Sequence, residues 1–426
     1  MIASLMEKRI RRAASALGIL LLLLLTAGAA EEQGASAERE AVVILLSFDG
    51  VRHDYLDRGG LPALARIARQ GARAKSLTPV FPSSTFPSHV ALATGAHTDR
   101  HGIVGNRFFD PAKGEFAYSN DASFIEAEPI WAAAERQGVR SAAFFWVGSE
   151  TDWNGIGASY RRAPFDAGIG EAEKVDQILA WLDLPQQERP RLILSWWHGA
   201  DEPGHSHGPD SRETTAALRA QDRELARLLE GLEERQAWSQ TTLLVVSDHG
   251  MIRVTEGIGA AAALEKARIR ARVIPGASYA LVYLDDPSER EAAVAALSAV
   301  EGVRAYAAGA VPEGLRFRHP TRTGDVVALT DPPRAFVRPW SERDRRLRVS
   351  RVFRTAVGAH GYDPGAYPEM GGIFLAMGRG VGAGAVLPPV RAIDVAPTVS
   401  ILLGIDPPAH AEGSPIPGIG SGVARD

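Results

Sequence analysis

The sequence predicts an α/β protein built on a doubly wound, mostly parallel sheet, with helices on both faces and a small α+β insert. Three apolar runs carry this prediction, at residues 41–48, 191–197 and 241–247. Residues 41–48 are apolar at nearly every position, as expected of a strand buried on both faces of a parallel sheet, and the pattern recurs in the other two runs. Stretches with a helical pattern, at 61–70, 130–137 and 214–235, lie between or beside them. Such alternation of strands and helices is typical of a doubly wound sheet.

Residues 1–30 predict a secretory signal peptide. Basic residues between Lys8 and Arg12 precede the apolar run from Leu17 to Leu25, and a small-residue cleavage site follows. This run is shorter than the roughly 20 apolar residues of a membrane span, so we expect no stable span after cleavage. Residues 31–40 predict a polar linker. Because the chain has no cysteine for a disulfide or a lipid anchor, we expect secretion across an inner membrane into the periplasm or the extracellular medium.

The rest of the chain, residues 41–426, predicts one large domain that contains the insert. The pattern changes at about 254–350, where residues 277–285 and 325–329 favour strands and residues 288–300 favour a helix. The formal net charge is −4, and loss of residues 1–30 would make the chain more acidic. This negative charge argues against binding to the phosphate backbone of long nucleic acids. The sequence leaves the oligomeric state open.

Acidic and histidine side chains follow the predicted strands at the edge where doubly wound sheets bind their ligands. Any one of them alone is explained as well by a helix cap or a turn. Taken together, three carboxylates and three imidazoles predict a pair of divalent metal sites. Mixed His and Asp ligands favour zinc over calcium or magnesium. The six candidate ligands are Asp49, Asp201, His205, Asp248, His249 and His360.

The stretch FPSSTFPSHVAL, residues 81–92, contains four hydroxyl side chains ahead of a short apolar helix. Pro87 is a natural first residue of a helix, so we expect Thr85 just before the helix, where free N–H groups favour anions. Thr85 could serve only as a cap. A metal-bound hydroxyl, however, loses its proton more readily than a free one and becomes a competent nucleophile.

Several short motifs follow one another in order over most of residues 41–405. The motifs are Ser47-Phe48-Asp49-Gly50-Val51-Arg52, Thr85-Phe86-Pro87-Ser88-His89, Thr94-Gly95 with His101-Gly102-Ile103-Val104-Gly105-Asn106, Glu128-Pro129-Ile130-Trp131, Asp201 through His205, Ser247-Asp248-His249-Gly250-Met251 and His360-Gly361. As a set they specifically resemble the nucleotide pyrophosphatase/phosphodiesterase family of the alkaline phosphatase superfamily. The resemblance implies an alkaline-phosphatase-like fold and a catalytic domain at 41–426.

The resemblance also implies a role for each site residue. Asp201, His205 and His360 would hold one zinc ion, whereas Asp49, Asp248 and His249 would hold a second that also binds Thr85. Thr85 would attack phosphorus and form a phospho-threonine intermediate, which water then hydrolyses. Asn106 and the backbone N–H of Phe86 would donate to a non-bridging phosphoryl oxygen, where charge develops.

Two aromatic positions of the family would form a slot for a nucleobase or another leaving group. They correspond to Phe86 and Trp196, with Tyr160 as a further candidate for the pocket wall. Trp196 stands where tyrosine is common and retains a stacking surface, whereas Ser88 stands where asparagine is common. A core role for Trp196 in a buried strand explains that residue nearly as well.

The sequence therefore predicts an exported, zinc-dependent phosphodiesterase or nucleotide pyrophosphatase that acts on a small-molecule substrate. Two Zn²⁺ would bring four positive charges, which three aspartates and an ionised Thr85 cancel; a neutral site suits a diester monoanion. An alternative enzyme with the same metals would hydrolyse phosphomonoesters, phosphonates or choline-phosphate diesters. A metal-stabilised binding module without turnover is a third interpretation, but it gives Thr85 no role.

Overall fold

The structure is a computed structural model, and it describes residues 41–337 and 357–420. The predicted signal peptide and linker lie outside the described residues, as does the end of the predicted insert beyond residue 337. Within the described part, none of the helices is both long enough and apolar enough to cross a membrane.

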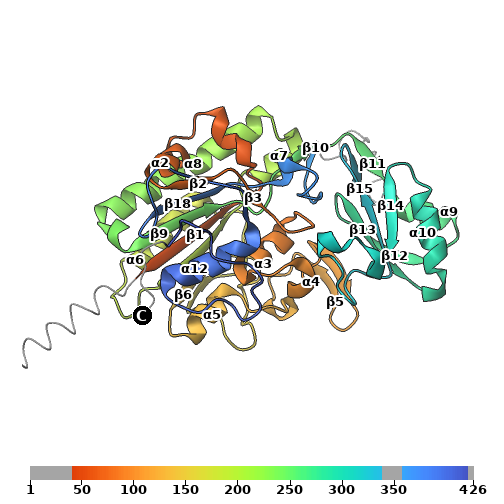
Figure 1. Cartoon of the computed structure of the whole chain (residues 1–426), viewed down its shortest axis with the longest axis horizontal. Coiled ribbons are helices and arrows are strands. Elements are labelled where there is room, and N and C mark those ends of the chain that lie inside the picture. The colour runs from red at the N-terminus through yellow and green to blue at the C-terminus, as the bar shows by residue number, and fades with distance from the viewer. Residues whose placement is uncertain (1–40, 338–356, 421–426) are drawn as a thin grey trace, which may run out of the picture. The chain divides into compact units, whose positions relative to one another are not determined.

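An eight-stranded sheet forms the centre of the structure (Figure 1). Seven strands point the same way, and only β18 runs antiparallel to its neighbours β9 and β2. The prediction of a mostly parallel α/β sheet is confirmed. In spatial order the strands are β19 (Ala385–Leu387), β2 (Ala72–Ala74), β18 (Phe374–Gly378), β9 (Thr241–Val246), β1 (Val42–Phe48), β8 (Leu192–Trp197), β6 (Ser141–Phe144) and β7 (Tyr160–Arg162).

The three apolar runs of the sequence are the three central strands, β9, β1 and β8. Every residue in them is buried, because helices cover both faces of the sheet. Their register aligns Phe48 of β1 with Trp197 of β8, and Ser47 of β1 with Val246 of β9. All three strands therefore end at one level, and the residues that follow them meet at one edge of the sheet.

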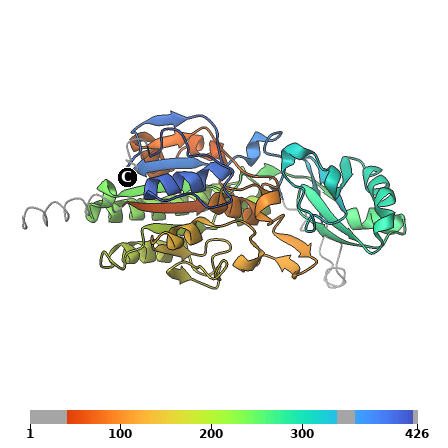
Figure 2. The same cartoon turned by 60° about the horizontal axis from the view of Figure 1, so that its bottom comes forward.

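Helices lie in two layers about this sheet (Figures 1 and 2). The longest, α8, places leucines toward the sheet at helical spacing, from Leu218 through Leu225 to Leu232, and exposes most of its charged residues. One layer contains α2 (Pro62–Gln70), α6 (Glu171–Leu182) and α8 (Arg212–Glu234), and the other contains α3 (Thr85–Thr94), α5 (Ile130–Arg136) and α12 (Val395–Leu403).

The described part of the predicted insert contains a separate four-stranded antiparallel sheet with helices α9 (Ala260–Lys266) and α10 (Arg290–Ser298). Alternate residues of its second strand face different cores: Ala280 and Val282 pack with the insert's helices, whereas Tyr279 and Leu281 join the main core. The insert is thus packed onto the central domain. In order its strands are β12 (Ala271–Pro275), β13 (Tyr279–Leu284), β15 (Val326–Thr330) and β14 (Val303–Ala307).

Short elements complete the structure and position the loops of the site. The two-stranded sheets are β3 (Leu77–Thr78) with β20 (Val390–Arg391), β4 (Arg107–Asp110) with β5 (Gly114–Ala117), β10 (Ile252–Arg253) with β17 (Gly358–Ala359) and β11 (Glu256–Ile258) with β16 (Arg334–Phe336). The short α-helices are α4 (Thr98–His101) and α7 (Asp201–His207). The 3₁₀ helices are η1 (His53–Arg58), η2 (Ala122–Phe124), η3 (Ala237–Ser239), η4 (Pro287–Glu289), η5 (Ala308–Ala310), η6 (Glu313–Leu315), η8 (Pro368–Met370) and η9 (Ala392–Asp394).

Candidate metal centre

Acidic residues follow the carboxyl ends of the three central strands and lie together at one edge of the sheet. Asp49 follows β1 and Asp248 follows β9, each within two residues of the strand end. Asp201 begins α7, which follows β8, and the helix places His205 one turn further on the same face. Two groups of side chains that could hold a metal ion result: Asp201, His205 and His360, and Asp49, Asp248 and His249.

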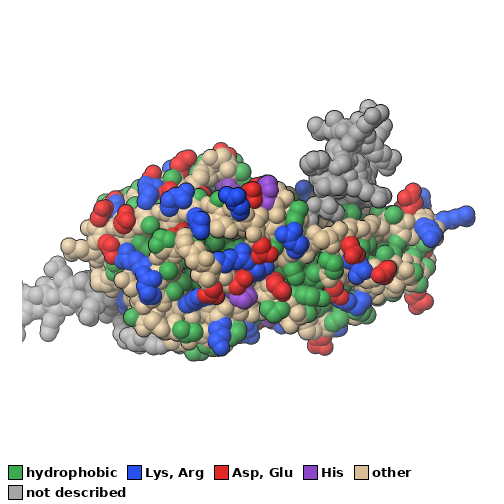
Figure 3. All heavy atoms as spheres, turned by 90° about the horizontal axis from the view of Figure 1, so that it is seen from above, with side chains coloured by type: hydrophobic (Ala, Val, Ile, Leu, Met, Phe, Trp, Pro, Cys, Tyr) green, Lys and Arg blue, Asp and Glu red, His purple; other side chains and the backbone are tan. Residues whose placement is uncertain are grey.

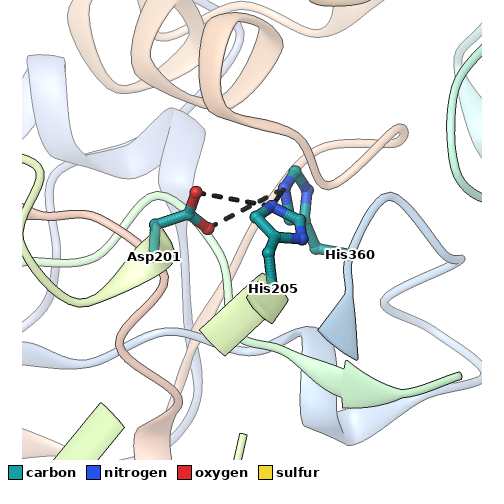
Figure 4. A group of neighbouring side chains, drawn as sticks. All are labelled: Asp201, His205 and His360. Carbon is teal, nitrogen blue, oxygen red and sulfur yellow. Dashed lines mark hydrogen bonds and ion pairs between the residues drawn. The ribbon is translucent and has the colours of Figure 1, made fainter. Parts of the chain in front are cut away.

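The first group is partly open to solvent, and Figure 4 shows the Asp201 carboxylate directed toward both imidazoles. His205 Nε2 lies 3.4 Å from Asp201 Oδ2, and His360 Nε2 lies 3.9 Å from Asp201 Oδ1. Each imidazole donates its Nδ1–H to a backbone carbonyl, of Gly358 for His205 and of Ser83 for His360. These bonds direct both Nε2 atoms, 3.2 Å apart, to the same point.

The second group is fully buried and contacts Thr85. His249 Nε2 lies 3.2 Å from Asp248 Oδ2 and 3.4 Å from Asp49 Oδ1. The same nitrogen lies 3.3 Å from Thr85 Oγ1. Since the His249 ring stacks on the His360 ring with centroids 3.7 Å apart, the two groups are adjacent.

The carboxylate oxygens of both groups fit bound cations. Asp49 Oδ1, Asp201 Oδ1 and Asp248 Oδ2 are buried, and none has a hydrogen-bond partner among the described residues. Buried carboxylates need a compensating charge, and a divalent cation supplies it.

Burial raises the pKa of Asp49 well above its usual range, and the charges of Asp248 and Asp201 raise it further. Burial opposes protonation of His205, but the Asp201 carboxylate outweighs it and raises the pKa of His205 to about 9.

Thr85 is the first residue of α3, whereas the sequence predicted a helix that begins two residues later. Ser84 takes the N-cap position with an extended backbone, and its side chain makes no capping bond. The Thr85 hydroxyl contacts His249 instead of capping the helix. The whole helix is buried, and the Nδ1–H of His89 donates to the Thr85 carbonyl oxygen at 2.8 Å.

Asn106 lies beside the nucleophile candidate, but its bonding differs from the expectation. The backbone N–H of Phe86 donates to Asn106 Oδ1 at 2.9 Å, so these two groups contact each other rather than point outward as parallel donors. A buried N–H needs an acceptor, and the carboxamide oxygen satisfies it. The carboxamide is thereby oriented with its Nδ2 group away from Phe86, where it can donate to another acceptor.

The two aromatic residues expected to form a slot are both buried. Phe86 is 3% exposed, and its ring meets the edges of Phe116 and Tyr118. Trp196 is 7% exposed, and its indole N–H donates to Asp49 Oδ2 at 2.9 Å. Trp196 therefore contacts a candidate metal ligand directly, which the sequence did not indicate.

The structure does not bring Tyr160 to this site, which corrects the expectation for that residue. Tyr160 lies on the edge strand β7, level with Ala142 of β6, and its hydroxyl donates to the Glu188 carbonyl just before β8. It thus lies toward the amino ends of the strands.

Phe165 lies next to the site instead, because its ring stacks on Trp196 with centroids 4.9 Å apart. Phe165 follows β7 in a loop, and no local pattern in the sequence singles it out.

A buried lysine supports the segment between β8 and Asp201. Lys174 Nζ donates to the Trp196 carbonyl oxygen at 2.9 Å and lies 3.2 Å from His198 Nδ1. Burial lowers the pKa of Lys174 to about 8. The lysine satisfies a carbonyl at the end of the central strand and so helps to fix the segment that leads to Asp201.

The fold and the site together define a class of α/β proteins in which two Asp/His groups and a buried hydroxyl converge at the carboxyl edge of a parallel sheet. The family model for type I phosphodiesterase / nucleotide pyrophosphatase matches residues 43–363. The chain belongs to this family.

Known proteins of similar sequence and structure carry related names. An uncharacterized pyrophosphatase/phosphodiesterase of Schizosaccharomyces pombe is 40% identical over 50% of this chain and 45% of that protein. Human ectonucleotide pyrophosphatase/phosphodiesterase family member 1 is 35% identical over 49% of this chain and 23% of that protein. The chain thus spans less than half the length of these curated relatives.

A solved structure of murine ectonucleotide pyrophosphatase/phosphodiesterase 5 is similar over nearly all of its own length. It is an inactive threonine-to-alanine variant in complex with AMP, with a TM-score of 0.80 and 27% identity. The similarity covers 88% of this chain and 98% of that one.

Proposed function

We propose that this protein is a zinc-dependent hydrolase of phosphodiesters or nucleotide phosphoanhydrides, with Thr85 as its nucleophile. The position of Thr85 carries the proposal: its hydroxyl is not used as a cap and lies 3.3 Å from His249 Nε2, within the second candidate metal group. Membership of the family supports the reaction class. The inactive threonine-to-alanine variant of the murine relative is consistent with a nucleophilic threonine.

The residues present fit two zinc ions. Asp201, His205 and His360 would hold one ion, and Asp49, Asp248 and His249 would hold the other beside Thr85. Bound there, the ions would supply the positive charge that lowers the pKa of a hydroxyl or a water and stabilises charge in the transition state.

The chain's own residues then carry out two displacements at phosphorus. Thr85 Oγ1 forms a bond to phosphorus while the bond to the leaving-group oxygen breaks, which gives a phospho-threonine. Water next attacks that phosphorus, and the bond to Thr85 breaks to release the product. The carboxamide Nδ2 of Asn106 donates to a non-bridging oxygen, and the amino end of α3 favours the anion.

Charge in the site favours a diester over a monoester. Three aspartates and an ionised Thr85 balance two divalent cations, so a monoester dianion needs a further cationic group. Arg52 lies near the site, but its guanidinium bonds Asp54, Asp210 and the Met251 carbonyl. It is therefore not free to take that role.

A small substrate and a location outside the cytoplasm complete the proposal. Basic and acidic side chains are interspersed on the face displayed in Figure 3, as suits a small substrate better than a long nucleic acid. Export rests on the pattern of residues 1–30 and is consistent with relatives named as ectoenzymes.

Rates on bis-p-nitrophenyl phosphate and p-nitrophenyl phosphate, with and without chelator, test the function. We expect a strong, chelator-sensitive preference for the diester. Thr85→Ala should lose at least about 10³-fold in kcat while it keeps bound zinc, because the nucleophile is removed but the six Asp and His ligands remain. The matched control is Thr94→Ala, at the other end of the same helix, where the hydroxyl donates to the Val90 carbonyl and accepts from the Ala96 N–H rather than contacting a candidate metal ligand.

Equal activity of Thr85→Ala and the parent protein would remove Thr85 from the mechanism. A preference for the monoester would show that a cationic group enters the site and that the charge argument is wrong.

A further inference from the structure

The insert contacts the segment of chain that carries Asn106, between α4 and the end of β4. Residues 102–106 lie outside helices and strands, and both Gly102 and Gly105 fall within them. Glycine restricts its own backbone less than any other residue does, so contacts from outside must fix where this segment lies. Those contacts also decide where the Asn106 carboxamide points.

One guanidinium of the insert bonds both ends of this segment. Arg322 Nη1 donates to the Gly102 carbonyl oxygen at 2.8 Å, and Arg322 Nε donates to Asp110 Oδ2 at 2.7 Å. Gly102 lies four residues before Asn106, and Asp110 lies four residues after it. Because the guanidinium is planar and its donors have fixed directions, it sets the distance between the two ends.

Further bonds hold Arg322 itself in place. The residue is only 2% exposed, and its Nη1 also donates to the Phe124 carbonyl oxygen at 2.7 Å. Its Nη2 lies 2.9 Å from Glu126 Oε1, and its backbone N–H donates to His319 Nδ1 at 3.2 Å. The guanidinium thus has two carbonyls and two carboxylates as acceptors, and hydrogen bonds between charged groups are stronger than neutral ones.

Two tyrosines of β13 contact the same segment from the insert. The Tyr283 hydroxyl accepts from the Phe109 N–H at 3.0 Å and donates to the Arg322 carbonyl oxygen at 2.6 Å. Tyr279 packs against Gly105, where an added Cβ would lie 2.2 Å from its hydroxyl. These two contacts lie on either side of the proposed phosphoryl-oxygen donor in the sequence.

The insert reaches the reaction centre through this segment rather than through the metal ligands. Among the described residues, Arg322 and Tyr283 have no hydrogen bond or ion pair with Thr85 or with any of the six candidate ligands. Asn106 does, at one remove, because its Oδ1 accepts from the N–H of Phe86, which directly follows Thr85. A change in the insert should therefore act on the carboxamide first.

We propose that the insert positions the Asn106 carboxamide for the transition state, with Arg322 and Tyr283 as positioning residues. This inference rests on the proposed function, in which Asn106 Nδ2 donates to a non-bridging phosphoryl oxygen. That bond strengthens as charge develops on the oxygen, so a displaced carboxamide should lower kcat and leave KM unchanged. The insert then sets the rate of the reaction and not the binding of metal or substrate.

A double-mutant cycle between Arg322→Lys and Asn106→Ala tests this inference in the zinc-loaded, full-length protein. Lysine keeps a positive charge beside Asp110 and Glu126 but lacks the planar fork that bonds both ends of the segment. On bis-p-nitrophenyl phosphate, Asn106→Ala should lower kcat by about 10²- to 10³-fold. Arg322→Lys should lower kcat by about 10-fold with KM unchanged, and should cause no further loss in the Asn106→Ala protein.

Two measurements separate positioning from general support of the fold. The thermal unfolding midpoint should fall by the same amount when Arg322→Lys is added to the parent or to Asn106→Ala, because the lost bonds stabilise the fold in both. The matched control is Arg304→Lys on β14 of the insert, where the guanidinium pairs with Asp331 and, among the described residues, bonds nothing in 102–110. It should leave kcat unchanged.

Tyr283→Phe gives a milder version of the same cycle. It removes only the hydroxyl that joins Phe109 to Arg322, so kcat should fall by about 3-fold, as for the loss of one neutral hydrogen bond. The same substitution should have no effect on kcat in the Asn106→Ala protein. If Arg322→Lys does not fold, this cycle alone decides the question.

The outcomes distinguish the two proposals. If Asn106→Ala lowers kcat but the insert variants lower it equally in both backgrounds, or not at all, the inference is overturned and the proposed function stands. A rise in KM or a loss of bound zinc in Arg322→Lys or Tyr283→Phe would also overturn it, because the insert would then support binding. If Asn106→Ala keeps the kcat of the parent, the inference fails together with the role of Asn106, whereas that of Thr85 is unaffected. If the zinc-loaded parent protein hydrolyses no diester, both proposals fail.

Discussion

The hydrogen bond from the Trp196 indole to Asp49 predicts that a change in the central strand weakens metal binding. Trp196→Phe removes the N–H that lies 2.9 Å from Asp49 Oδ2 but keeps an aromatic ring against Phe165. Asp49 Oδ1 already lacks a hydrogen-bond partner among the described residues, so the variant leaves both carboxylate oxygens without one. The ligand that should bind the metal beside Thr85 thus loses the hydrogen bond that orients its carboxylate.

The magnitude follows from the chemistry of this bond. A buried hydrogen bond to a charged group contributes about 1.5–3 kcal/mol. We therefore expect Zn²⁺ affinity at the second group to fall roughly 10- to 100-fold, as is typical when a partner of a metal ligand is removed. Affinity at the group of Asp201, His205 and His360 should change little, because Trp196 makes no hydrogen bond to those side chains.

Competition with a chromophoric chelator measures zinc affinity at both groups. We expect kcat on a diester to fall together with the zinc affinity of the second group. The matched control is Trp197→Phe on the same strand, which also removes an indole N–H and leaves a similar cavity. That N–H donates to Ser195 Oγ at 3.1 Å rather than to a metal ligand. Equal zinc affinity in the two variants would refute the reasoning. It would leave Trp196 as a core or stacking residue only.

Three further predictions concern metal, packing and charge. Chelation should lower the thermal unfolding midpoint, and added Zn²⁺ should restore it, because the buried carboxylates lose their compensating charge; an unchanged midpoint in scanning fluorimetry would argue against resident metal. Gly105→Ala should destabilise the protein by about 1–3 kcal/mol in urea denaturation, since a Cβ there would lie 2.2 Å from the Tyr279 hydroxyl. Tyr279→Phe should recover part of that loss, and no recovery would mean that the hydroxyl is not the obstacle. Burial lowers the pKa of Lys174 to about 8 from an ordinary 10.5, so the unfolded chain binds more protons between these values and stability rises with pH there. From pH 7.5 to 9.5, the free energy of unfolding of the parent protein should rise by on the order of 2 kcal/mol more than that of Lys174→Met. Parallel curves of stability against pH for the two proteins would contradict this.

Much of the fold was readable from the sequence because its signals are local. A strand buried on both faces is mostly apolar, and the three central strands, β1, β8 and β9, lie within a residue of the predicted runs. The ends of such strands share one edge of a parallel sheet, so Asp49, Asp201 and Asp248 could be expected near one another before any coordinates were known.

The start of α3 shows where local signals fail. Pro87 is a favoured first residue, yet the helix begins at Thr85, and Pro87 fits its first turn because an N–H there would have no intrahelical acceptor. Only the structure shows that the Thr85 hydroxyl contacts His249 rather than a free N–H of its own helix.

The sequence by itself determined the sheet, the family motifs and the kinds of side chain available for chemistry. The tertiary structure alone decided which of those side chains contact one another. Trp196 bonds Asp49, Asn106 bonds Phe86, and Phe165 rather than Tyr160 lies beside the site. Each outcome depends on residues far apart in the chain, whose distances are set by how sheet, helices and loops pack together. Secondary-structure patterns report a residue's own neighbourhood and contain no information about such distances.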